Sequence, residues 1–249
     1  MKLFQLPQQL WLQQPYAGKS GHSQLPPPTH LPYSIPSLRL KIRTFTPLAL
    51  SDPGASGLNS SIKSNLGKLL ADALRYYYFD SDSVVEEALG GKDAVRSFVK
   101  TDLKGFRDSE TEVLKQLSSM GRLVIGAGNG AVQRAANLAL MRHGISIWID
   151  VPLDMVAKEI VEESFQPPAS ETIKGAYPEV LTQLTAIYEE SRKGYATADT
   201  TIALQKVASR LGYDTLDAVT TEDMVLETLK EIERLMRVKK LMEEAARPF

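Results

Sequence analysis

Apolar and polar positions follow two alternating periods along the chain from residue 57 onward. Apolar residues recur every three or four positions in segments that we expect to be helical, namely 65–75, 82–90, 94–119 (as one or two helices), 130–144, 153–164, 178–195 and 221–246. Between them, short apolar runs bounded by glycine, proline or aspartate predict strands at 76–80, 122–128, 145–152 and 200–204. This alternation predicts an α/β fold of three layers, with helices on both faces of a central parallel sheet.

Acidic residues and glycines follow two of the predicted strands. Asp80 and Asp82 come at the end of 76–80, and the run Gly128 to Gly130 follows 122–128. Ligands of parallel α/β sheets bind at the carboxyl ends of the strands, so we expect a site here. The alternative is that Asp80 or Asp82 only caps the next helix.

The first 56 residues differ in composition from the remainder. Residues 1–51 contain no Asp or Glu, and Gln, Ser, Leu and Pro dominate them, with LPPPTHLP at 25–32. A basic segment without acids is typical of an organelle transit peptide, and a disordered tail that carries no address is the alternative. We therefore divide the chain into a disordered leader and linker over 1–56 and a folded domain over 57–249.

The composition argues against several kinds of site. The chain has no cysteine and three histidines, two of which lie in the leader, so we expect no zinc site, iron–sulfur cluster or Ser-His-Asp triad. The formal net charge of -1 does not favour nucleic acid as a partner. No apolar run has the length of a membrane span.

The stretch SGLNSSIKSNLGK at 56–68 is close to a phosphate-binding loop, G-x-x-x-x-G-K-[ST]. Lys63 and Ser64 match the end of that motif, whereas Ile62 replaces its second glycine. A β-branched side chain disfavours the positive φ that glycine supplies there. The alternative is that Lys63 and Ser64 simply begin an ordinary helix.

Three further blocks follow in order: YYYFDSDSVVEEALGG, GFRDSETEVLKQL and VIGAGNGAVQRAANLALMRHGISIWIDVP. Together with the loop they resemble the shikimate kinase family over about residues 57–215. The resemblance implies a P-loop kinase-like fold and, in an active member, ATP and Mg²⁺ as cofactors. It places Lys63 and Ser64 at the nucleotide, and Ser64 and Asp80 at the metal.

The resemblance also implies a substrate side of the site. Asp82 matches the residue that binds the substrate hydroxyls, and Arg107 matches the arginine that pairs with the substrate carboxylate. Gly128 and Gly130 match the outer glycines of the family's substrate loop. Asn129 replaces the middle glycine, and we expect its side chain to protrude toward the substrate. Outside the family, Arg107 would be interpreted as a solvated helix residue.

Several departures from the family predict a damaged catalytic site. Ser60 and Ile62 stand where the family has glycine, and no arginine occurs between Asp154 and Ser191, where the family's lid carries one. Ser191 occupies the place of the second carboxylate-binding arginine, with Arg192 one residue late. Pro47 interrupts the apolar run before the loop, so the first strand is either degraded or absent through a splice or gene-model variant.

These departures favour a catalytically inactive shikimate kinase-like protein that acts as a binding or regulatory module. The resemblance, together with the transit-like N-terminus, implies that it lies in the chloroplast, and the resemblance alone implies a role in chloroplast biogenesis. We expect no catalytic residue and no cofactor, a plastid protein or small metabolite as partner, and a monomer. The alternative is an active ATP- and Mg²⁺-dependent kinase of shikimate or a related hydroxy acid. A third hypothesis is a scaffold that binds a protein through the long C-terminal helix, although packing of that helix on the domain's own sheet is the simpler interpretation.

Overall fold

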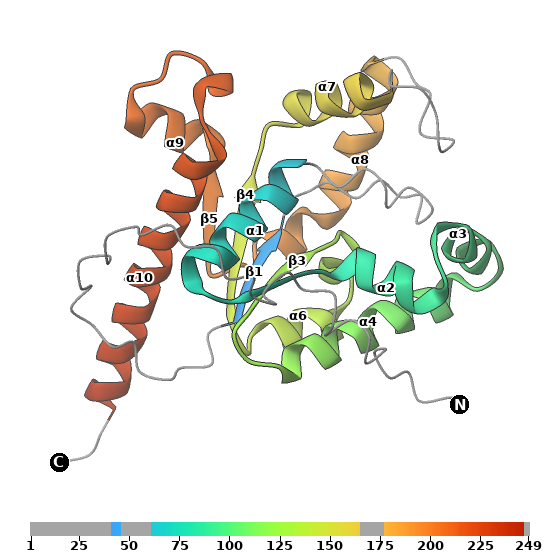
Figure 1. The fold of residues 1–249 in the computed structure, drawn as a ribbon, viewed down its shortest axis with the longest axis horizontal. Helices are drawn as coiled ribbons and strands as arrows, with labels where there is room; N and C mark the ends of the chain where they lie inside the picture. The colour runs from blue at the N-terminus through green and yellow to red at the C-terminus, as the bar shows by residue number, and fades with distance from the viewer. Residues whose placement is uncertain (1–40, 46–60, 165–176, 247–249) are drawn as a thin grey trace, which may run out of the picture.

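The computed structural model describes residues 41–45, 61–164 and 177–246. Its centre is a five-stranded parallel sheet with the strand order β2-β3-β1-β4-β5 (Figure 1). The strands are β1 (Lys41–Phe45), β2 (Tyr77–Asp80), β3 (Leu123–Ala127), β4 (Ile145–Asp150) and β5 (Thr200–Ala203). Parallel pairing runs from Lys41↔Leu123 on one side of β1 and from Ile42↔Ile145 on the other.

Ten α-helices connect and cover these strands in the described part of the chain. They are α1 (Ser61–Leu74), α2 (Ser81–Leu89), α3 (Lys92–Thr101), α4 (Leu103–Ser119), α5 (Gly130–Gln133), α6 (Ala135–Met141), α7 (Leu153–Ser164), α8 (Tyr177–Tyr195), α9 (Leu204–Leu211) and α10 (Thr221–Ala245). A short 3₁₀ turn, η2 (Leu216–Ala218), precedes α10. The capping box of Thr220 and Asp223 fixes the start of α10, because each side chain accepts a hydrogen bond from the backbone N–H of the other residue.

Separate hydrophobic cores fill the two sides of the sheet, and the alternation along β3 explains why. Val124 packs with α1, α7, α8, α9 and α10, whereas Leu123 and Ile125 pack with α2, α3 and α4. A third cluster joins Ala127 at the end of β3 to α4, α5, α6 and the end of α8. The expected three-layer α/β architecture is confirmed.

The first strand is present, and the prediction that it would be degraded or missing is wrong. β1 lies at the centre of the sheet between β3 and β4, inside the segment 1–56 that the composition assigned to a leader and linker. Pro47 follows this strand and does not interrupt it, since the strand ends at Phe45. The sequence KIRTF has the β-branched and aromatic residues that favour strands. Residues 1–40 and 46–60 lie outside the described residues.

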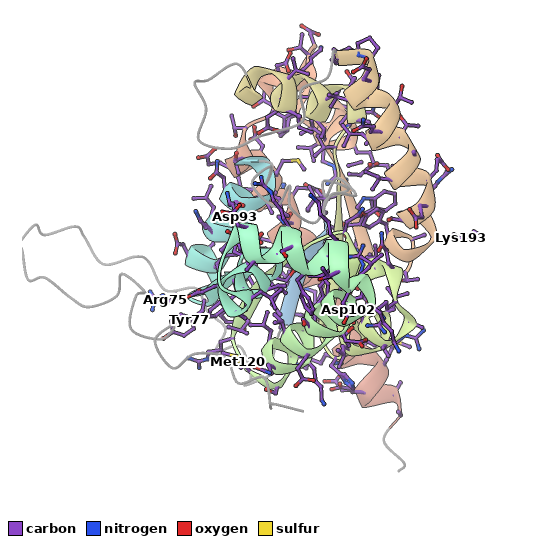
Figure 2. The ribbon with its side chains drawn as sticks, turned by 90° about the vertical axis from the view of Figure 1, so that its right-hand side faces the viewer. Arg75, Tyr77, Asp93, Asp102, Met120 and Lys193 are labelled. Atoms are coloured by element: carbon purple, nitrogen blue, oxygen red, sulfur yellow. The ribbon has the colours of Figure 1, made fainter. Side chains whose placement is uncertain are left out.

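The other predicted elements are confirmed with local differences. The segment 94–119 forms two helices that meet at Asp102, which is labelled in Figure 2 and caps α4 by accepting from the Gly105 amide at 2.8 Å. The predicted helix 130–144 is broken at Arg134, whose backbone is extended. Helix α9 was not predicted.

The C-terminal helix packs on the domain through most of its apolar stripe. Ile232 is buried, and Leu229 and Met236 contact the same core, which confirms the simpler interpretation for these residues. Beyond them, Val238, Leu241 and Met242 are exposed. No helix in the described ranges is long and apolar enough to cross a membrane.

Candidate functional site

The sequence-predicted residues gather where β2 and β3 end. Asp80 is the last residue of β2 and the N-cap of α2, while Lys63 lies in the first turn of α1. Gly128 and Gly130 follow β3. These elements meet because α1 packs on β2 and β3, and α2 packs on the same two strands. These residues therefore lie together at the carboxyl ends of two neighbouring strands, as the sequence predicted.

Asp80 is both a helix cap and a member of an ion pair. Its Oδ1 accepts from the Asp82 and Ser83 amides, each at 3.1 Å, and from Ser83 Oγ at 3.3 Å. Its Oδ2 lies 2.9 Å from Lys63 Nζ. The capping interpretation of Asp80 is therefore confirmed, and its second carboxylate oxygen pairs with Lys63.

Lys63 lies between the two carboxylates and is almost fully buried. Only 4% of its side chain is exposed, and Nζ is 3.8 Å from Asp82 Oδ2 in addition to its contact with Asp80. Burial lowers the pKa of Lys63, but the two carboxylates outweigh that effect and the net pKa is raised. Burial also raises the pKa of Asp82, against the opposing effect of Lys63. Lys63 is therefore a charged ammonium held by the buried Asp80 and the partly exposed Asp82.

Tyr78 is a member of the site that sequence reasoning missed. Two glycines leave room for it, because a Cβ at Gly67 or at Gly126 would overlap the Tyr78 ring or hydroxyl. The hydroxyl lies 3.5 Å from Asp80 Oδ2 and accepts a hydrogen bond from Ser64. Burial and the nearby Asp80 raise the pKa of Tyr78, so the phenol keeps its proton. The available signal was the period of two in YYYFD, which places Tyr78 and Asp80 on one face of β2.

Arg107, which the resemblance placed at the substrate, is paired with Glu110, a residue that the sequence did not single out. Arg107 Nη1 donates to Glu110 Oε2 at 2.9 Å and to Oε1 at 3.1 Å, and the guanidinium lies 5.8 Å from the Phe106 ring centroid. Burial raises the pKa of Glu110 to about 7, although Arg107 opposes the shift. The spacing of Arg107 and Glu110 on one helix was the signal that could have identified this pair.

The two glycines allow the loop after β3 to approach these acids closely. A Cβ at Gly128 would overlap the Asp82 carboxylate, and one at Gly130 would overlap Glu110 and Arg107. The Gly128 amide donates to Ser81 Oγ at 3.1 Å. Asp82, Arg107, Gly128 and Gly130 thus adjoin one another, as the resemblance implied.

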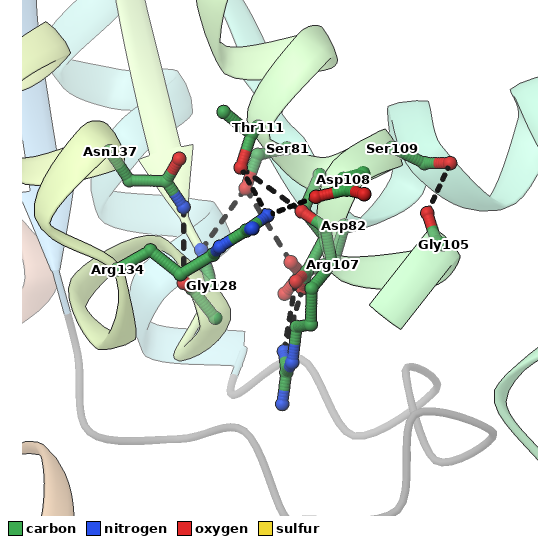
Figure 3. Close-up of polar contacts among 12 residues, drawn as sticks. Ser81, Asp82, Gly105, Arg107, Asp108, Ser109, Thr111, Gly128, Arg134 and Asn137 are labelled. Carbon is green, nitrogen blue, oxygen red and sulfur yellow. Dashed lines mark hydrogen bonds and ion pairs between the residues drawn. The ribbon is translucent and has the colours of Figure 1, made fainter. Parts of the chain in front are cut away.

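Arg134 fastens this loop to α4 (Figure 3). Its Nη1 lies 2.7 Å from Asp108 Oδ1 and 3.1 Å from Thr111 Oγ1. Asn137 Nδ2 donates to the Gly130 carbonyl at 3.3 Å. These contacts explain the break between α5 and α6, because the extended backbone at Arg134 directs its side chain toward α4.

Asn129 does not protrude toward a ligand, so that expectation is wrong. Its backbone is right-handed helical, with φ -62 and ψ -36, and its side chain is buried. The Tyr195 hydroxyl donates to Asn129 Oδ1, and the Tyr195 ring stacks on Trp148 with centroids 5.8 Å apart. Asn129 therefore bonds to the end of α8 instead of lining the site.

The register at the end of α8 agrees with the loss of a second arginine. Ser191 is buried, whereas the Arg192 side chain is 62% exposed and lies 3.8 Å from Glu189. Arg192 therefore points away from the cluster around Asp82. Ser60 and the lid residues 165–176 lie outside the described residues, and the Ile62 side chain is not described.

The donor groups do not fit a magnesium ion in this arrangement. The Ser64 hydroxyl is bonded to Tyr78, and both Asp80 oxygens are engaged, one by the α2 amides and the other by Lys63. In the parts of the chain that the structure describes, no three His, Cys, Asp or Glu residues are grouped so that they could hold a metal ion. Mg²⁺ prefers several oxygen ligands in near-octahedral geometry, and this cluster already contains a cation, the Lys63 ammonium.

The shikimate kinase family model matches residues 59–232, which covers the whole cluster. The chain belongs to the shikimate kinase family. An Arabidopsis thaliana protein named "Probable inactive shikimate kinase like 1, chloroplastic" is 60% identical over 193 residues, which are 78% of this chain and 66% of that protein. Shikimate kinase 2, chloroplastic, of Oryza sativa subsp. japonica is 36% identical over 72% of this chain and 59% of its own length.

Solved structures agree on the fold. The shikimate kinase of Bacteroides thetaiotaomicron gives a TM-score of 0.58 at 20% identity, over 78% of this chain and 98% of that one. The Acinetobacter baumannii shikimate kinase in complex with shikimate gives 0.57 at 22% identity, over 78% of this chain and 93% of that one. The P-loop kinase-like fold is therefore confirmed.

The plant relatives also bear on location and extent. Their names describe them as chloroplastic, which confirms the expected chloroplast location. The chain spans about two thirds or less of their length, at 66% and 59% for the two named above.

Proposed function

We propose that this shikimate kinase-like protein does not transfer phosphate and instead serves chloroplast biogenesis as a binding or regulatory module. One observation carries the proposal: Lys63, the residue that would contact the outer phosphates, is buried and paired with both Asp80 and Asp82. Phosphoryl transfer depends on cations aimed at the transferring group. A lysine that already neutralises two internal carboxylates supplies little of that stabilisation.

The substrate side supports binding without catalysis. Arg107, Asp82 and the two glycines lie next to one another, and the Arg107 side chain is 25% exposed. A planar guanidinium can bind a carboxylate with two parallel hydrogen bonds once Glu110 is displaced or protonated. A small hydroxy acid is therefore the metabolite class that this half of the site favours, and a plastid protein that senses the occupied state is the proposed partner.

An active kinase of shikimate or a related hydroxy acid is the competing function. It is favoured by the survival of Lys63, Ser64, Asp80, Asp82 and Arg107 in one cluster within a chain that the family model matches. The competing function needs Lys63 and Ser64 to leave their internal partners when nucleotide arrives. Both functions predict hydroxy-acid binding, and only the competing one predicts ADP release.

The experiment that separates them is a coupled ADP-release assay on the full chain with ATP, Mg²⁺ and shikimate. The rice shikimate kinase 2 serves as the positive control under the same conditions. We expect the ADP released in the presence of shikimate to equal the background measured without it. We also expect calorimetry to detect shikimate binding to the wild type and no binding to Arg107→Ala. Shikimate-dependent ADP release would overturn the inactive assignment. A biogenesis role is tested in a plant that lacks the protein, in which we expect defective plastids that the wild-type chain restores.

A further inference from the structure

We propose that the Lys63 ammonium neutralises the Asp80–Asp82 pair, and that Tyr78 bonds to the groups that the resemblance assigned to a metal ion. The residues that match the phosphate loop would then stabilise the fold instead of binding nucleotide. This inference rests on the proposed function, because it explains how the nucleotide half of the site became internal. It assigns Lys63 and Ser64 a role in folding in place of the phosphate and metal roles that the resemblance implied.

The contacts of Lys63 are those of a structural ammonium. The group is enclosed by the N-terminal turn of α1 and the end of β2, and the Asp80 that it pairs with is itself only 8% exposed. A lysine that serves a ligand has to present its ammonium to that ligand, whereas 4% exposure leaves almost no surface for contact. Ion pairs this deeply buried are strongly destabilising to break, because the remaining charge is left without a partner.

Tyr78 closes the other side of the cluster. Its ring lies against Gly67 of α1, and its hydroxyl lies against Gly126 of β3, so the phenol fills the space between helix and sheet. From there it receives a hydrogen bond from Ser64 and reaches Asp80 Oδ2 at 3.5 Å. Ser64 and Asp80 are the two residues that the resemblance assigned to the metal. A phenol is a neutral group that links a hydroxyl to a carboxylate without adding charge.

Charge balance explains why the ammonium is needed. Asp82 faces Lys63, Asp80 and Arg107, and Arg107 is itself shared with Glu110. Without Lys63, the Asp80 and Asp82 carboxylates would lie side by side. The Arg107 guanidinium would then be the cation shared by Asp80, Asp82 and Glu110. Two carboxylates in one buried site cannot both ionise readily, so the pair requires a cation in contact.

The test is thermal unfolding of the full chain, without nucleotide, for wild type, Lys63→Met and Lys68→Met. Lys68 lies on the same helix with an exposed side chain, so its replacement is the matched control. From the typical penalty for breaking a buried pair we expect Lys63→Met to lower the Tm by about 10 °C, and Lys68→Met by about 1 °C or less.

Two results would overturn the inference. The first is a Lys63→Met protein as stable as Lys68→Met in the absence of nucleotide. The second is a wild-type Tm that Mg²⁺ with ATP raises while Lys63→Met loses that response.

A milder pair of variants covers the case in which Lys63→Met does not fold. Tyr78→Phe removes only the hydroxyl that joins Ser64 to Asp80, and Tyr77→Phe is its control. Tyr77 is 45% exposed and lies with Arg75 at the outer edge of the molecule (Figure 2). We expect Tyr78→Phe to have a lower Tm than the wild type and Tyr77→Phe to have an unchanged Tm. Equal Tm values for the two variants would overturn the role of Tyr78.

The outcome is separable from that of the proposed function. ADP release by the wild type would refute the inactive assignment whatever the Tm of the variants. An inactive wild type with a stable Lys63→Met would leave the proposed function standing and refute only the structural role of Lys63.

Discussion

Glu110 makes the stability of this protein depend on pH in a direction that can be worked out from its surroundings. Burial raises its pKa from 4.5 to about 7 in the folded chain, against the opposing influence of Arg107. In the unfolded chain the carboxyl is solvated and its pKa returns to the ordinary value. The folded state therefore holds the proton more tightly than the unfolded state does.

The sign and size of the effect follow from this difference. Below pH 4.5 both states are protonated and the stabilising contribution is fully present. As pH rises through the folded pKa of about 7, the unfolded state has already lost its proton and the contribution is lost. At about 1.4 kcal/mol for each pH unit between the two pKa values, the free energy of unfolding falls by about 3 kcal/mol across this window.

Replacing Glu110 with glutamine removes the titration and keeps the shape of the side chain. We expect the difference in unfolding free energy between wild type and Glu110→Gln to change by about 3 kcal/mol between pH 4.5 and pH 8, wild type being favoured at the acidic end. Urea unfolding at four pH values measures this difference. Glu112→Gln, on the same helix with a side chain 41% exposed, is the control that should run parallel to wild type.

A pH-independent difference between wild type and Glu110→Gln would refute the reasoning. It would mean that the Arg107 contacts at 2.9 and 3.1 Å hold Glu110 ionised despite burial. The wild-type slope alone cannot decide this, because the raised pKa of Asp82 contributes a slope of the same sign. The comparison with Glu110→Gln is therefore the decisive measurement.

Three other changes have outcomes set by the described contacts. Tyr195→Phe leaves the buried Asn129 oxygen without its hydroxyl donor, and we expect a loss of about 1–3 kcal/mol in urea unfolding, with Tyr188→Phe close to neutral. Gly128→Ala places a methyl group against the Asp82 carboxylate, and we expect calorimetry to show shikimate binding lost; unaltered affinity would contradict the close approach. Truncation after Leu229 removes the buried Ile232 and should leave the chain insoluble, while truncation after Arg237 should give a normal circular dichroism melt.

Part of the fold could be predicted because local patterns agree with the global arrangement. The alternation after residue 75 places each strand and most helices correctly, since buried parallel strands are continuous apolar runs. The first strand could not be predicted in the same way. Its five residues, KIRTF, lie in a segment of leader-like composition and are followed closely by Pro47, so that only their long-range pairing with β3 and β4 identifies them.

The same distinction between local patterns and long-range contacts applies to the residues of the site. Asp80, Asp82, Arg107 and the glycines were predictable because each follows a strand or carries the chemistry of the resemblance. The partners of these residues were not, since Tyr78 and Glu110 act only through contacts that folding creates. The error about Asn129 has the same origin. The sequence shows which residue replaced a glycine, while the direction of its side chain depends on Tyr195, which is 66 residues away.

The internal pairing of the site suggests how a kinase fold can lose phosphate transfer without losing its charged residues. Three cations of the cluster, Lys63, Arg107 and Arg134, each contact an acid of the same chain, at 2.9, 2.9 and 2.7 Å. An incoming phosphate must displace a carboxylate from each cation that it uses, at the expense of an interaction of about 4 kcal/mol for charges 4 Å apart near a protein surface. The exposures, 4% for Lys63 against 25% and 35% for the arginines, make Lys63 the hardest to recruit. An anion entering this site would therefore be met by Arg107 and Arg134, on the side where the resemblance places the substrate.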